Sequence, residues 1–211
     1  MTFRKTAGLL LAALLICAAY WAWTWTRPGP LSPSGGLYFP ARVEIPLPHF
    51  AQADPRWGGL PLGSTPSTIA GEGCAVAAAA MVLAGYGAAI DPGKLNAFLT
   101  ARPGGYTPEG WIYWEKAAEI DPALTAKLLP HYEDAGSYFW LDWNLFRGNP
   151  VIVRLRYGNG TTHFVVVVGK QGRDYLVLDP GHGFGKGVYP LREFGSDIEA
   201  IRFYRLPSTR G

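Results

Sequence analysis

Cysteine is scarce in this sequence: among 211 residues, only Cys17 and Cys74 carry a thiol. Cys17 lies in an apolar run near the N-terminus, so the rest of the chain offers Cys74 no partner for an internal disulfide. A small secreted module stapled by disulfides is therefore excluded.

Charge is also sparse. Charged residues make up 17% of the chain against 48% hydrophobic residues, and the formal net charge is only +3. The Lys and Arg residues are scattered and no run of five basic residues occurs, so no nucleic-acid partner is predicted. The composition is typical of a globular or membrane-attached protein, and the length suits one domain with an appendage.

That appendage is the N-terminal segment, residues 1–26. Within it, Thr6–Thr26 is uncharged for 21 residues, and a helix of this length spans a hydrocarbon core of ~30 Å. Arg4 and Lys5 precede the run and place the N-terminus in the cytoplasm, whereas the aromatic residues near its end suit the outer interface. An uncleaved membrane anchor and a cleaved signal segment both remain open. Under either interpretation the remainder is exported, to the periplasmic or extracellular side.

Two further segments follow the appendage. Residues 27–42, RPGPLSPSGGLYFPAR, are rich in Pro, Gly and Ser and predict a linker. A globular composition then continues through residues 43–207, which we expect to form a single domain. Four helices are predicted in its first part: residues 75–83, 92–99, 107–120 and 136–148.

The pattern changes after residue 150. Four runs rich in β-branched and aromatic residues are separated by glycine-containing turns: PVIVRLRY, THFVVVVGK, DYLVLDP and IEAIRFYRL. A helical first half followed by an antiparallel sheet predicts the α+β fold class.

Cys74 lies behind Gly71-Glu72-Gly73 at the first turn of a predicted helix. A thiolate there meets unpaired backbone N–H groups and the positive end of the helix dipole, and both favour the reactive form. The alternative is a small buried hydrophobic residue, as most free cysteines are. The helix start, and the room that we expect the paired glycines to leave above the sulfur, favour a nucleophile.

A nucleophilic thiol needs a base and a group that orients the base. His163 opens the strand THFVVVVG, and Asp179 ends the strand LVLD sixteen residues later. If residues 162–169 and 174–179 form a hairpin, both side chains lie at the same end of the sheet. Asp-Pro is a common turn opener, so the prediction depends on the pairing of Asp179 with His163.

The segments QADPRW, GEGCAVAAAAMVLAGYG, DPGKL, HFVVVVG and VLDP together resemble the peptidase C39-like family, papain-like cysteine peptidases related to bacteriocin leader peptidases. The resemblance covers about residues 44–206 and implies a papain-like fold. It also implies that Cys74 is the nucleophile, His163 the general base and acid, and Asp179 the residue that orients it. Gln52 of QADPRW matches the residue that donates to the oxyanion. Gln52 lies 22 residues before Cys74, a longer separation than in close relatives of the leader peptidases, so the intervening insertion has to loop out.

The expected activity is that of a membrane-tethered cysteine peptidase cleaving a peptide or protein outside the cytoplasm, with no cofactor or metal. A zinc site formed by Cys74, His163, Asp179 and His182 is disfavoured because no pair of them has the close spacing of such a site. Three alternatives remain open: a cell-wall peptide hydrolase, a non-catalytic peptide-binding module on the same fold, and an acyl or peptidyl transferase. Gly73 counts against the cell-wall hydrolases, which usually carry an aspartate before the cysteine.

Overall fold

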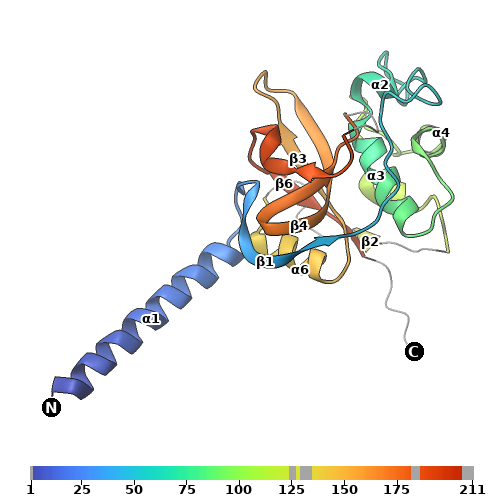
Figure 1. Ribbon diagram of the computed structural model, residues 1–211. Helices are drawn as coiled ribbons and strands as arrows, with labels where there is room; N and C mark the ends of the chain where they lie inside the picture. Colours follow the sequence, from blue (N-terminus) through green and yellow to red (C-terminus); the bar gives the residue numbers. More distant parts are fainter. Residues whose placement is uncertain (1, 124–126, 129–134, 182–185, 206–211) are drawn as a thin grey trace.

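A long N-terminal helix projects from a two-part domain in the computed structural model (Figure 1). The structure describes residues 2–123, 127–128, 135–181 and 186–205. The helices are α1 (Thr2–Thr26), α2 (Ile69–Glu72), α3 (Cys74–Gly85), α4 (Pro92–Thr100), α5 (Trp114–Ala118), α6 (Tyr138–Phe146) and the 3-10 helix η1 (Leu191–Phe194). The strands are β1 (Ser34–Glu44), β2 (Lys127–Leu128), β3 (Val151–Arg156), β4 (Thr162–Leu178), β5 (Tyr189–Pro190), β6 (Ala200–Arg202) and β7 (Tyr204–Arg205).

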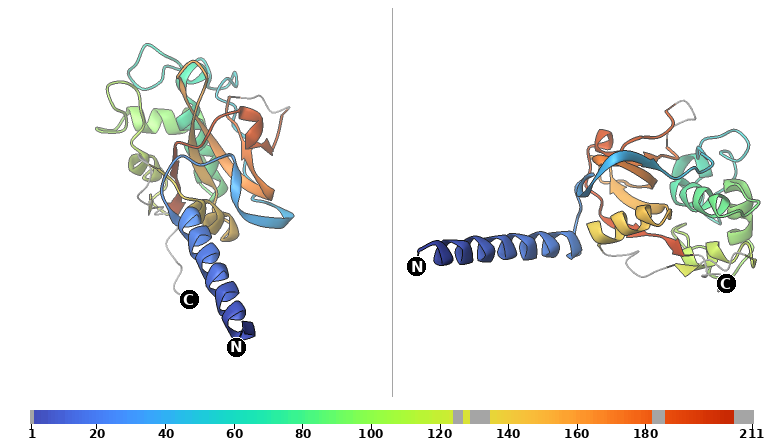
Figure 2. Two further views of the ribbon diagram at one scale, coloured as in Figure 1. Left: turned by 90° about the vertical axis from the view of Figure 1, so that its left-hand side faces the viewer. Right: turned by 60° about the horizontal axis from the view of Figure 1, so that its bottom comes forward.

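The main sheet is antiparallel. Its strand order is β1-β4-β3-β6, β5 pairs with β4, and β2 pairs with β7 in a small separate sheet. Helices α3, α4 and α5 lie on one side of the main sheet and α6 on the other (Figures 1 and 2). The predicted α+β class is confirmed.

The centre of the sheet is buried on both faces. Val166 and Val168 pack into the cluster that contains α3, whereas Val165 and Val167 pack into the cluster that contains α6. A strand covered on both sides has no need for alternating polar residues, which explains the run of four valines in β4.

β4 doubles back on itself. A straight strand of 17 residues would extend over about 55 Å, yet His163 Nε2 and Asp179 Oδ1, at its two ends, are 2.7 Å apart. Gly172 near its middle has φ +60°, a conformation that glycine adopts without strain. The two strands predicted at residues 162–169 and 174–179 are therefore the two arms of one bent strand.

The segment predicted as a linker contains most of β1, which pairs with β4 at the edge of the sheet. An edge strand tolerates Pro40 because the missing N–H can face away from the neighbouring strand. Gly36 is required by packing: its φ is +67°, and an added Cβ would collide with the Asp142 carboxylate. The glycines that suggested a flexible segment thus allow side chains of α6 to approach the backbone of β1 closely. The linker prediction is therefore wrong for residues 34–42.

The helix predictions differ in quality. Asp91 caps α4 by accepting from Lys94 N, with proline at the first helical position as predicted, and α6 forms where expected. The helix predicted at residues 107–120 shrinks to α5 because Gly110 adopts φ +88° and a bridge joins Tyr106 to Ile112. In α1, Thr6–Thr26 is long and apolar enough to cross a membrane, and no residue of its most apolar stretch is buried.

Candidate active site

Cys74 is the first residue of α3, directly after the short helix α2. Gly73 joins the two helices, and a Cβ on it would lie 2.5 Å from Ile69 O. We expected the glycines to leave room above the sulfur; the structure shows instead that Gly73 lets α2 approach α3. The Cys74 side chain is largely buried, with 9% of the residue exposed, at the edge of a cleft.

His163 reaches the same place from β4. It lines the cleft with Cys74, is only 4% exposed, and its Nε2 lies 2.7 Å from Asp179 Oδ1. The rings of Phe194 and Tyr157 pack against the imidazole, with centroids at 5.7 and 5.2 Å. Because Nε2 is engaged by Asp179, Nδ1 is the ring nitrogen left for the thiol.

Asp179 is held by more than the histidine. Oδ1 also accepts from Gly181 N at 2.7 Å, Oδ2 accepts from the Tyr189 hydroxyl at 2.6 Å, and the backbone carbonyl contacts His49 Nε2 at 2.9 Å. Sequence reasoning did not find Tyr189, because the approach of β5 to this end of β4 is a tertiary contact. The sequence Asp-Pro-Gly predicts a turn at Gly181, but it does not show that the Gly181 N–H would bind the carboxylate of Asp179.

Charges within the site shift both pKa values. Burial disfavours the imidazolium, but hydrogen bonds to Asp179 and Cys74 and their charges outweigh it and raise the pKa of His163 from 6.5 to about 9. Burial opposes the Asp179 carboxylate too, yet its bonds to His163, Tyr189 and Gly181 lower the pKa of Asp179 below 3.8. Near neutral pH the pair is therefore an imidazolium and a carboxylate.

Gln52 lies in the same cleft despite its distance in the sequence. Its Nε2 donates to Ala70 O at 2.8 Å, and its backbone N–H donates to Pro180 O at 2.8 Å. The intervening chain loops out and returns, as the bond from Ala70 N to Gly58 O at 2.9 Å indicates. The structure thus brings together the four residues singled out from the sequence.

The cleft has a volume of about 550 Å³. Cys74 and His163 line it together with Trp111 and Tyr113, which are 70% and 45% exposed. A groove of this size, open to solvent and lined by exposed aromatic rings, can accept an extended chain. Within the described parts of the chain, no three His, Cys, Asp or Glu side chains cluster closely enough to hold a metal ion. His182, considered as a ligand, lies outside the described residues.

A helix that begins with a thiol, beside an antiparallel sheet that presents a histidine–aspartate pair, is the architecture of the papain-like cysteine peptidases. The chain belongs to the Peptidase C39 like family, whose model matches residues 44–204. The predicted family is thereby confirmed.

A solved structure has a similar fold. The crystal structure of a C39-like peptidase candidate from Bacillus anthracis superposes with a TM-score of 0.50 at 18% identity, covering 80% of this chain and 100% of that one. At this identity the likeness shows the fold alone. No match was found among curated proteins.

Proposed function

We propose that the chain is a membrane-tethered cysteine peptidase that cleaves amide bonds outside the cytoplasm. The observation that carries the proposal is the His163–Asp179 pair, 2.7 Å apart and adjacent to Cys74 at the start of α3. In this proposal Cys74 is the nucleophile, His163 the general base and acid, and Asp179 the group that fixes the imidazole.

The reaction would proceed in two steps. The Cys74 thiolate attacks the carbonyl carbon, the C–N bond breaks, and the His163 imidazolium gives its proton to the departing amine. The acyl group is then bound to sulfur as a thioester. His163, now neutral, takes a proton from water; the hydroxide attacks the thioester, the acid leaves, and the thiolate–imidazolium pair is restored.

Gln52 is assigned to the oxyanion. The amide NH₂ has two hydrogens, and Ala70 O accepts one of them, so the second remains to donate to the negative oxygen that develops during attack. One such donor lowers the barrier by about 3 kcal/mol in related sites. The bond to Ala70 orients the amide before substrate binds, because it fixes which end of the side chain faces the cleft.

The tether is assigned to α1. Thr6–Thr26 has the length and composition of a membrane span, and the basic pair before it predicts a cytoplasmic N-terminus. Trp25, near its end, donates from Nε1 to Asp142 of α6 at 2.9 Å. A segment removed by a signal peptidase would have no need for such a contact, so this bond favours an uncleaved anchor.

Alkylation of Cys74 by iodoacetamide as a function of pH tests the proposal. The full chain carrying Cys17→Ala, so that one thiol remains, is compared with the same chain carrying His163→Ala. We expect alkylation to begin well below pH 8 in the parent and to shift toward pH 8.5, the range of ordinary thiols, in the variant. A Cys74→Ala chain is the matched control for cleavage of a random peptide library, which it should not cleave.

If alkylation begins near pH 8.5 in both chains, no thiolate–imidazolium pair forms in the folded protein. That result would favour the non-catalytic binding module. Rapid alkylation without cleavage, but with transfer of an acyl group to an added amine, would favour the transferase.

A further inference from the structure

Helix α6 carries a row of aromatic side chains on its outer face. Phe139, Trp143 and Phe146 are spaced four and three residues apart and so share one side of the helix. Their rings follow one another with centroids 6.1 and 6.4 Å apart, and Trp143 and Phe146 are 41% and 76% exposed. We call these three side chains the α6 ridge. Exposed neighbouring rings of this kind mark an interaction surface.

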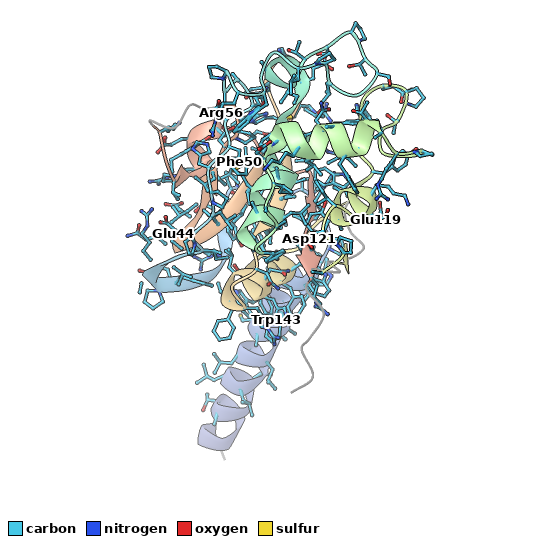
Figure 3. All side chains as sticks on the ribbon, turned by 90° about the vertical axis from the view of Figure 1, so that its right-hand side faces the viewer. Glu44, Phe50, Arg56, Glu119, Asp121 and Trp143 are labelled. Carbon is cyan, nitrogen blue, oxygen red and sulfur yellow. The ribbon has the colours of Figure 1, made fainter. Side chains whose placement is uncertain are left out.

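The α6 ridge continues the aromatic end of α1. Trp25 meets Phe139 edge to face at 5.1 Å, and Trp21 stacks on Trp25 at 5.5 Å. A chain of ring contacts therefore runs from the apolar helix onto the domain. Figure 3 shows Trp143 at the end of the domain where α1 is attached, and Figure 2 shows α6 on the side from which α1 projects.

Arginines accompany the rings. The Arg147 guanidinium lies 5.8 Å from the Trp143 ring, and that of Arg27 lies 5.0 Å from the Trp23 ring. Tryptophan and arginine together are typical of the interfacial layer of a bilayer, where the rings enter the boundary of the acyl chains and the cations meet anionic headgroups.

A buried polar network fixes the angle between α1 and the domain. Asp142, on the inner side of α6, accepts from Trp25 Nε1 at 2.9 Å, from Leu37 N at 2.7 Å and from Lys170 Nζ at 2.5 Å. Lys170 also donates to Gly35 O at 2.7 Å, and both charged side chains are fully buried. Because one carboxylate joins α1, β1, β4 and α6, the ridge stays beside the end of the helix.

From this continuity we propose that the α6 ridge docks the domain onto the headgroup layer of the membrane that α1 crosses. The proposal rests on the proposed anchoring by α1. Docking would hold the domain in one orientation, with α2 and the start of α3 at the far end of the molecule from α6 (Figure 1). The cleft beside Cys74 then faces away from the lipid and takes its substrate from the aqueous side.

Lipid-dependent quenching of a fluorophore tests the docking. The full chain carrying Cys17→Ala and Cys74→Ala receives a single new cysteine at Phe146→Cys, is labelled with a polarity-sensitive dye, and is reconstituted into vesicles of phosphatidylcholine and phosphatidylglycerol. The matched control carries the label at Trp111→Cys, a site of similar exposure at the cleft. We expect lipids that carry a nitroxide near the headgroup to quench the dye at position 146 several-fold more than the dye at position 111. Iodide in the aqueous phase should instead quench the dye at position 111 more than the dye at position 146.

Two outcomes overturn the proposal in distinguishable ways. If the labelled chain floats with the vesicles but iodide reaches both positions equally, the anchor stands and the docking is refuted. If the chain does not float with the vesicles, the anchoring fails and the docking fails with it. Adding Trp143→Glu to the chain labelled at position 146 should abolish the shallow quenching, because a charge would then enter the ridge, whereas Trp111→Glu should leave it unchanged.

Discussion

Replacing His163 by glutamine removes a titrating group whose pKa differs strongly between the folded and the unfolded chain. The folded pKa is about 9 and the ordinary value is 6.5, so the folded protein holds this proton more tightly. Below about pH 6.5 both states are protonated and the full stabilisation is present. Between 6.5 and 9 unfolding releases this proton, so the contribution of His163 alone to the free energy of unfolding falls by about 1.4 kcal/mol per pH unit, a total of about 3 kcal/mol over this interval of about 2.5 units.

The measurement is urea unfolding of the full chain in a nonionic detergent, followed by tryptophan fluorescence between pH 6 and pH 9.5. The quantity of interest is the difference in unfolding free energy between Cys74→Ala and the double variant Cys74→Ala/His163→Gln, because other groups that titrate in this range affect both chains. We expect this difference to decrease as the pH rises from 6 to 9.5, by less than about 3 kcal/mol because the missing thiol is one of the groups that raise the pKa of His163. With Cys74 in place the difference between the wild-type chain and His163→Gln should change less, because on unfolding the thiolate of the pair takes up a proton and offsets the one that His163 releases.

A difference that stays constant over the whole range would refute the reasoning. It would mean that Asp179 does not raise the pKa of His163 in the folded protein. A decrease that is unaffected by Cys74→Ala would leave the pairing with Asp179 intact but contradict the coupling to the thiol.

Three further substitutions have defined outcomes. Tyr189→Phe removes a hydrogen bond that lowers the pKa of Asp179, so that pKa should rise, which the carboxyl carbon-13 shift of Asp179 measured against pH will show; an unchanged pKa would contradict the reasoning. Gly181→Ala places a Cβ 3.0 Å from His163 Cε1 and should displace the imidazole. We expect alkylation of Cys74 at pH 7 to slow by up to roughly a hundredfold, with an unchanged circular dichroism spectrum. Gly59→Ala is the matched control, because nothing lies within 4 Å of the added Cβ, and it should not change the alkylation rate. Lys170→Met leaves a buried carboxylate without its cation and should cost about 3–5 kcal/mol in urea unfolding, with an unchanged denaturant midpoint as the contradicting result.

Several structural features were readable from local sequence. The change from helical to β-branched patterning after residue 150 predicts the α+β class, because it reflects which backbone conformations the side chains favour. Asp91-Pro92 predicts the start of α4, because both a cap and a fixed φ act within one turn. For the same reason the position of Cys74 at a helix start was accessible from its neighbours alone.

The linker prediction failed because composition does not distinguish a glycine that is flexible from one that is packed. Gly36 lies against Asp142 only because α6, more than 100 residues later, comes to rest there. Pro40 is acceptable only because β1 is at the edge of the sheet, which depends on where β4 lies.

The sequence by itself determined which residues could carry the chemistry: one thiol at a helix start, one histidine at a strand start, and an aspartate one hairpin away. Only the tertiary structure decided how they are held. The bend at Gly172 closes His163 onto Asp179, β5 brings the Tyr189 hydroxyl to the carboxylate, and a loop returns Gln52 to the cleft. These contacts join segments distant in the chain, so their energies depend on the packing of the whole domain and not on any local pattern.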